Sequence, residues 1–153
     1  MKRLLGPLYR LRRLAWRLLR PRTRGVKVML FNAAGELLLV RHSYGDTGLF
    51  LLPGGGVRPF EDPAKAAARE IREELGCGVA GLRLVSVHAS THEGKRDTVF
   101  LFSASPVGAV RIDGVEIAEA GFFALDALPA ATSPATLRRL AERSGERAAD
   151  AGW

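Results

Sequence analysis

Residues 55–77 read GGVRPFEDPAKAAAREIREELGC, and this stretch decides the fold. Asp62 suits the N-cap of a helix, Pro63 suits its first position, and Gly76 suits the left-handed residue that ends one. The stretch therefore predicts a helix over residues 63–75. At roughly 100° per residue, the apolar side chains of this helix share one arc, which should pack on a sheet. The residues of that arc are Ala64, Ala67, Ala68, Ile71 and Leu75.

Acidic side chains gather on a neighbouring arc of the same predicted helix, at Glu70, Glu73 and Glu74. Like charges three or four residues apart cost roughly 0.2–0.5 kcal/mol per pair, and folding gives no reason to place them there. A hard divalent cation does, because Mg²⁺ prefers carboxylate oxygens. Arg69 is placed to hold Glu73, four residues later. For an isolated Glu-Glu pair, the alternative interpretation is a solvated acidic face of the helix.

These residues belong to a longer pattern. Gly55 is followed after five residues by Glu61 and after seven more by REI at 69–71, EE at 73–74, then Gly76 and Cys77. This pattern resembles the Nudix box at every position, although the family's last position is usually aliphatic. The preceding FLLPGG at 50–55 is similar to the family's aromatic-x-x-Pro-Gly-Gly lead-in, with Phe where Trp is common. The resemblance covers about residues 22–145.

The resemblance implies an α/β fold, a Nudix-type α/β/α sandwich with a mixed sheet, in which the box forms a loop, a helix and a loop. It also implies a pyrophosphohydrolase that cuts a diphosphate linkage. By the family's pattern Glu70, Glu73 and Glu74 would bind Mg²⁺ or Mn²⁺. Bound metal would clamp the diphosphate and lower the pKa of an attacking water.

The resemblance implies roles for further residues. Arg69 would act in catalysis with Glu73, and Gly55 and Glu61 would support them. The general base varies within the family. Glu73 is slightly ahead as the base here, and two glutamates of the later segment are the alternatives. These are Glu116 and Glu119.

Apolar runs outside the box predict further elements. The predicted strands cover residues 26–31, 36–41, 82–89, 98–103 and 121–124, with a tight turn at 32–35 and a short apolar run at 49–52. Ser133 and Pro134 suit the start of a closing helix over residues 133–143. Strands interleaved with helices predict an α/β or α+β sandwich. We expect a domain over residues 22–147 and a C-terminal tail over 148–153.

The net charge of +7 comes from one end of the chain. Nine of the 23 basic residues lie within residues 1–24, which hold no acid, so the remainder carries 14 basic and 16 acidic residues. A basic pI is therefore poor evidence that the body of the protein binds nucleic acid. The apolar share of 47% and the charged share of 25% are typical of a soluble globular protein.

Residues 1–21 predict a basic amphipathic helix, with leucines at helical spacing and arginines between them, followed by a short linker at 22–24. Arginine interrupts every apolar run, which argues against a membrane span. Two interpretations are even: contact of residues 1–20 with an anionic membrane surface, or packing on the domain or on a partner subunit. A homodimer and an organellar transit sequence stay open. We otherwise expect a cytoplasmic protein.

Other reactive side chains have plainer interpretations. The single cysteine, Cys77, excludes an internal disulfide and is expected to be a small buried apolar residue. The histidines His42, His88 and His92 are expected at the surface or at the edge of a pocket. Basic and aromatic side chains that could line a pocket are more simply exposed: Arg41, Tyr44, Lys95 and Arg96.

The leading hypothesis is an enzyme that hydrolyses a nucleoside diphosphate linked to another moiety, such as a nucleotide sugar, a dinucleotide or a nucleoside triphosphate. An RNA 5′-end pyrophosphohydrolase is a second enzyme hypothesis, in which the basic arm contacts phosphates. A non-catalytic module that senses nucleotides on a Nudix scaffold is a third hypothesis, which degenerate box carboxylates would favour. A membrane-associated adaptor, led by the arm, is a fourth.

Overall fold

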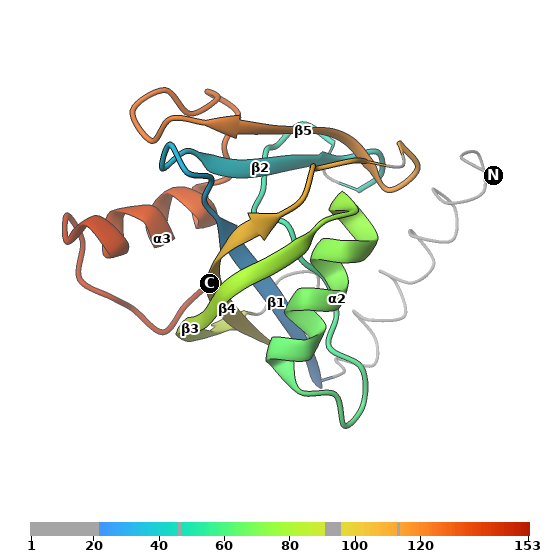
Figure 1. Cartoon of the computed structure of the whole chain (residues 1–153). Coiled ribbons are helices and arrows are strands. Elements are labelled where there is room, and N and C mark those ends of the chain that lie inside the picture. The colour runs from blue at the N-terminus through green and yellow to red at the C-terminus, as the bar shows by residue number, and fades with distance from the viewer. Residues whose placement is uncertain (1–21, 46, 91–95, 113) are drawn as a thin grey trace.

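The computed structural model describes residues 22–45, 47–90, 96–112 and 114–153. A three-stranded sheet and a two-stranded sheet lie between two helices (Figure 1). The strands are β1 (Arg22–Leu30), β2 (Leu37–His42), β3 (Gly78–Ser90), β4 (Arg96–Val107) and β5 (Ile117–Phe123), and the helices are α2 (Pro63–Leu75) and α3 (Pro134–Ser144). This arrangement is the expected α/β/α sandwich.

The larger sheet is mixed, with the strand order β1-β4-β3. Strand β1 runs parallel to β4, with Arg22 opposite Arg96 and Leu30 opposite Ala104. Strand β3 runs antiparallel to β4, and the smaller sheet is the antiparallel pair of β2 and β5. Backbone bonds between Val40 and Leu51, at 2.8 and 2.9 Å, join the smaller sheet to the segment that leads into the box.

Strand β1 is apolar on both faces, because each face meets a different core. Val26, Val28 and Leu30 of β1 pack with Ile71 and Leu75 of α2. Met29, between them in the sequence, points into a second core with residues of β2 and with Leu140 of α3. A side-chain period of two thus divides one strand between two helices, which explains its nearly continuous apolar sequence.

Both helices begin and end where their caps predict. The Asp62 side chain accepts hydrogen bonds from the backbone N–H groups of Ala64 and Lys65 at 2.8 and 3.3 Å, and Gly76 ends α2 with a left-handed φ of 62°. Ser133 caps α3 in the same way, through the N–H of Thr136 at 3.2 Å. Helix α2 therefore spans the predicted residues, 63–75.

Some predicted boundaries were wrong. Residues 22–24, predicted as a linker, are the first residues of β1, because Arg22, Thr23 and Arg24 pair with β4. Strands β3 and β4 are longer than predicted, since pairing continues to Gly78 and Val107 through positions that lack apolar alternation. The predicted N-terminal helix lies outside the described residues. Within those residues, no helix is long and apolar enough to cross a membrane.

The C-terminal residues pack on the second core. Gly152 forms a bridge with Ala89 at the end of β3, and Trp153 donates its N–H to the carbonyl of Ala89 at 2.9 Å. The ring of Trp153 lies 5.7 Å from that of His88, centroid to centroid. His88 is therefore buried, and not at the surface or at the edge of a pocket, where we expected it. No pattern in the sequence indicated that Asp150 and Trp153 would contact it.

Candidate active site

The glycine loop before α2 runs along the free edge of β1. Val28 and Val26 donate their N–H groups to the carbonyls of Pro53 and Gly55, at 3.0 and 2.9 Å. Gly54 has a φ of 136°, and a Cβ there would lie 2.2 Å from the carbonyl oxygen of Val26. A Cβ on Gly55 would lie 2.4 Å from Oε2 of Glu70. The glycine loop thus brings backbone without side chains close to the box glutamate Glu70.

Arg69 is the centre of the site. Its Nε and Nη2 donate to the two carboxylate oxygens of Glu61 at 2.8 and 2.9 Å, a bidentate pair. Its Nη1 donates to Glu70 at 2.6 Å and to Glu73 at 3.2 Å. The guanidinium also donates to the Gly56 carbonyl at 2.9 Å, which fixes the glycine loop to the helix. One arginine thus orients most of the predicted site.

These contacts shift the pKa values of the groups involved. The hydrogen bonds from Arg69 lower the pKa of Glu61 to about 2, so Glu61 is ionised at every physiological pH. The pKa of Arg69 is raised, first by its bond to Glu61 and then by Glu70. Burial raises the pKa of Glu70 despite the neighbouring arginine. Glu61 therefore stays ionised and keeps its ion pair with Arg69, whereas the surroundings of Glu70 make its ionised form less stable.

Glu74 is the most buried of the box glutamates, with 6% of its surface exposed. It accepts a hydrogen bond from the N–H of Gly54 at 2.9 Å. Burial raises its pKa to about 7, and the charges of Glu70 and Glu116 act in the same direction, while Lys27 and the Gly54 N–H oppose them. Burial thus makes the ionised form of Glu74 costly, and either a proton or a bound cation would relieve that cost.

Glu73 faces outward at the edge of the same cluster, with 52% of its side chain exposed. Its two oxygens face two arginines: Arg69 at 3.2 Å and Arg58 at 3.5 Å. Glu73 is thus within reach of a ligand that enters from solvent, unlike Glu74, and it is held in place from the protein side.

The carboxylate oxygens of Glu70, Glu73 and Glu74 are the kind of ligand that a hard divalent cation prefers. Glu74 among them is buried and has a raised pKa. Within the described part of the chain, no group of acidic, histidine or cysteine side chains converges as a ready-made metal site. Arg69 and Arg58 are bonded to oxygens of Glu70 and Glu73 instead. Metal binding at these residues therefore requires small side-chain rotations away from the arginines.

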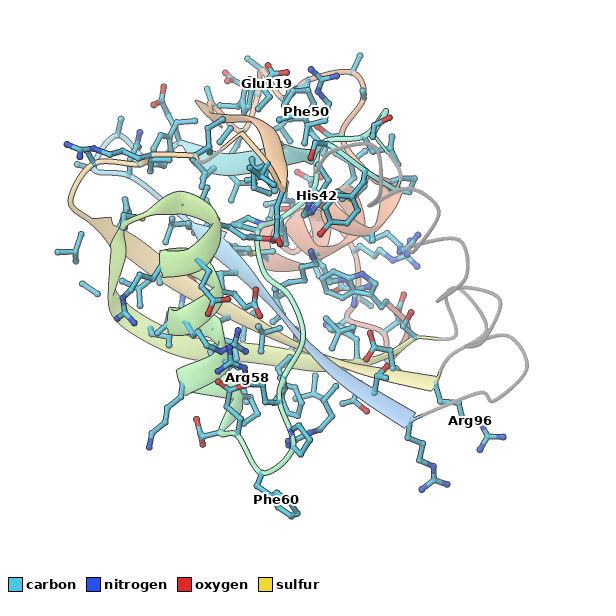
Figure 2. The ribbon with its side chains drawn as sticks, turned by 90° about the vertical axis from the view of Figure 1, so that its right-hand side faces the viewer. His42, Phe50, Arg58, Phe60, Arg96 and Glu119 are labelled. Carbon is cyan, nitrogen blue, oxygen red and sulfur yellow. The ribbon has the colours of Figure 1, made fainter. Side chains whose placement is uncertain are left out.

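The two later glutamates lie in different surroundings. Glu116 precedes β5, and its charge acts on both Glu70 and Glu74, which places it beside the box cluster. Glu119 forms an ion pair with Arg41 at 2.6 Å. In Figure 2, Glu119 lies at the top of the molecule, and Arg58 lies well below it. Geometry therefore separates the two alternatives that the sequence left equal.

Two neighbours of the site, Lys27 and Arg58, were not found from the sequence. Lys27 donates to the Leu52 carbonyl at 2.9 Å, and its charge acts on Glu74 and His42. Burial, and after it the positive charge of Lys27, lowers the pKa of His42 to about 4, so His42 is neutral at pH 7. The available signal was a lone lysine within the apolar run of β1. Arg58 gave no signal, because it occupies a variable position of the box.

The remaining reactive residues lie elsewhere. Cys77 is buried in the core beside α2, and burial raises its pKa, as expected of a structural cysteine. Arg41 lies over the ring of Phe50, 5.9 Å from its centroid, in addition to its pair with Glu119. His92 and Lys95 lie outside the described residues.

Known proteins resemble this chain over the box and both sheets. Residues 21–143 match the NUDIX domain. An uncharacterized Nudix hydrolase of Pseudomonas aeruginosa is 37% identical over 103 residues, which cover 65% of this chain and 61% of that protein. The chain thus spans less than two thirds of that relative's length.

Two solved structures share the fold. The MutT Nudix hydrolase from Burkholderia pseudomallei superposes with a TM-score of 0.71 at 28% identity, covering 78% of this chain and 95% of that one. A UDP-X diphosphatase superposes with a TM-score of 0.66 at 26% identity, covering 83% of this chain and 64% of that one. The box residues, the sandwich and these matches agree: the chain belongs to the Nudix hydrolase family.

Proposed function

We propose that this protein is a divalent-metal-dependent hydrolase that cuts the diphosphate linkage of a nucleoside diphosphate joined to a second moiety. The observation that carries the proposal is the cluster around Arg69. It gathers Glu61, Glu70, Glu73 and Glu74, and it includes a buried glutamate whose pKa is raised to about 7. An intact carboxylate set argues against a module that only senses nucleotides.

In this proposal Glu70, Glu73 and Glu74 hold Mg²⁺ or Mn²⁺. When bound, the metal would neutralise diphosphate oxygens and make a water more acidic. The protein supplies the rest. Glu61 fixes Arg69, and Arg69 fixes Glu70 and Glu73 in one orientation. The positive charge of the bound metal, and not the carboxylates that hold it, would stabilise the negative charge that develops at phosphorus.

Glu73 is the proposed general base, because it is half-exposed and held by Arg69 at the edge of the cluster. Glu116 is the second candidate, since its charge acts on Glu70 and Glu74. Glu119 is less suited, because it lies far from Arg58 and the box loop in Figure 2 and pairs with Arg41 of the neighbouring strand β2. The solved UDP-X diphosphatase supports a nucleoside-diphosphate-linked substrate, and this support is by similarity of fold and sequence only.

The test is phosphate or nucleotide release from a substrate panel, with and without Mg²⁺ or Mn²⁺. The panel holds nucleotide sugars, dinucleoside polyphosphates, nucleoside triphosphates and 5′-triphosphate RNA. We expect metal-dependent turnover that Glu73→Gln lowers by about 100-fold or more. Glu146→Gln, at an exposed glutamate just after the end of α3, is the matched control and should turn over normally.

Turnover without metal, or equal turnover in Glu73→Gln, would refute the proposal. Nucleotide binding without any turnover would favour the sensing module instead. The partners predicted for residues 1–20, an anionic membrane surface or a second subunit, stay predictions. Deleting these residues should leave turnover intact if the arm only positions the enzyme.

A further inference from the structure

Arg58 reaches the catalytic cluster from the tip of the box loop. Its Nη2 lies 3.5 Å from Oε1 of Glu73, while Arg69 approaches the other oxygen of the same carboxylate at 3.2 Å. The Arg58 side chain is 65% exposed. An exposed pair at this distance contributes little to stability. Folding therefore gives no reason for a second arginine at Glu73.

The backbone of Arg58 is fixed although its side chain is exposed. Its N–H donates to Oε2 of Glu61 at 2.8 Å, and its carbonyl accepts from Nη2 of Arg24 at 3.3 Å. Glu61 is itself held by both nitrogens of the Arg69 fork. The loop thus attaches the Arg58 backbone to the centre of the site. Figure 2 shows Arg58 beside α2, with Phe60 projecting from the loop beyond it.

We infer that Arg58 alternates between two anionic partners, the Glu73 carboxylate in the metal-free protein and a phosphate oxygen of the substrate in the loaded enzyme. This inference rests on the proposed function. It makes Arg58 a substrate-binding residue that also opposes metal binding.

The first half follows from competition for one carboxylate. A cation that binds Glu73 must replace the contact with Arg58, and it must do so beside a fixed positive charge. Removing that charge removes both obstacles. The metal-free protein therefore binds a divalent ion more weakly with Arg58 than without it.

The second half follows from reach and geometry. A diphosphate held by a metal at Glu70, Glu73 and Glu74 would lie next to the carboxylate that Arg58 already contacts. A planar guanidinium with exposed donors suits phosphate oxygens, which it binds in a bidentate manner. Once metal occupies Glu73, Arg58 is released at the place where the substrate's negative charge arrives.

The experiment compares wild type, Arg58→Gln and Lys65→Gln in two assays on the full chain. Lys65 lies exposed in the first turn of α2, and no ion pair within the described residues joins it to a box glutamate. The first assay titrates the metal-free protein with Mn²⁺ alone and follows binding by electron paramagnetic resonance. The second measures KM and kcat for the best substrate of the panel at saturating metal.

We expect opposite effects in the two assays. Arg58→Gln should bind Mn²⁺ about three-fold more tightly and raise KM by about ten-fold, with a smaller change in kcat. Lys65→Gln should match wild type in both. Weaker or equal Mn²⁺ binding by Arg58→Gln, or an unchanged KM, would overturn the inference while leaving the metal centre standing. Failure of wild type to bind Mn²⁺ would overturn the proposed function and the inference together.

Discussion

Two arginines organise two clusters of acidic side chains, and the clusters differ in their balance of charge. Arg69 bonds Glu61, Glu70 and Glu73 beside the glycine loop, and its side chain is 16% exposed. Arg139 of α3 is fully buried and bonds Glu142 at 2.8 Å and Asp150 at 3.3 Å. Arg69 thus joins the glycine loop to α2, and Arg139 joins α3 to the C-terminal residues.

The Arg139 cluster is balanced. Arg147 adds a second positive charge at Asp150, and burial together with Arg139 lowers the pKa of His88, which favours the neutral ring. The neutral His88 contacts Arg139 and Ser86 and bonds the Asp150 carbonyl. Each acid has a base, so the cluster can be buried under Trp153 without an unpaired charge.

The Arg69 cluster has more acid than base. Glu74 is buried, and its hydrogen-bond partner among the described residues is a single backbone N–H, that of Gly54. The negative charge of Glu70 acts on Glu74 and raises its pKa further. Both carboxylates have a raised pKa, chiefly through burial. The comparison teaches that an arginine among glutamates is structural where charges balance. Surplus acid raises the pKa of the buried carboxylates instead, which agrees with the proposed binding of a cation there.

Breaking the balanced cluster should have the largest effect on stability. Arg139→Met leaves Glu142 and Asp150 without their buried partner, so the free energy of unfolding should fall by about 3–5 kcal/mol. Urea denaturation measures this loss. Turnover per folded molecule should stay at the wild-type value, because Arg139 lies on the opposite core from the box. A large loss of turnover in the folded variant would mean that the clusters are coupled.

Removing the buried negative charge of Glu74 should instead raise the free energy of unfolding of the metal-free protein. The pKa of Glu74 is about 7 in the folded protein, above its ordinary 4.5, so the folded state binds this proton more tightly than the unfolded chain. Stability of the metal-free protein should therefore fall as pH rises from about 4.5 through 7. Glu74→Gln removes this loss and should stabilise the metal-free protein at pH 8 by up to about 3 kcal/mol, with almost no effect near pH 4.5.

Glu142→Gln is the matched change in the balanced cluster. It weakens a buried charged hydrogen bond to Arg139, so the free energy of unfolding should fall by about 1–3 kcal/mol at pH 8. Urea denaturation of both variants in a metal chelator tests the pair. Destabilisation by Glu74→Gln at pH 8 would show that the Arg69 cluster is balanced after all.

A smaller effect is expected at the tip of the box loop. Glu61 donates its N–H to the carbonyl of Arg58 at 3.1 Å, and this closes a turn in which Phe60 has a φ of 62° and is fully exposed. A left-handed conformation costs a residue with a side chain about 1–2 kcal/mol, and part of this cost returns as chain entropy with glycine. Phe60→Gly should therefore stabilise the protein by up to about 1 kcal/mol.

Thermal unfolding measures this gain, with Leu125→Gly as a control at another exposed apolar residue, where no positive φ is present. The control should show no gain. Equal behaviour of the two variants would mean that Phe60 is not strained in solution.

The sequence by itself determined the box helix, the family and the identity of the acidic residues. Asp62, Pro63 and Gly76 set the helix ends through bonds within a few residues of each other, and such local signals need no tertiary context. The grouping of Glu70, Glu73 and Glu74 on one arc also follows from helical periodicity alone. The sequence of residues 55–77 therefore predicts these features without the rest of the chain.

Only the tertiary structure decided what surrounds those glutamates. The raised pKa of Glu74 depends on its burial and on its contact with the glycine loop, and the different surroundings of Glu116 and Glu119 depend on which segments lie beside each of them. Lys27 acts on the site from β1. The first residues of β1 and the burial of His88 were likewise set by pairing with distant segments. Burial and long-range electrostatics depend on which segments meet in space, and local sequence patterns do not encode that.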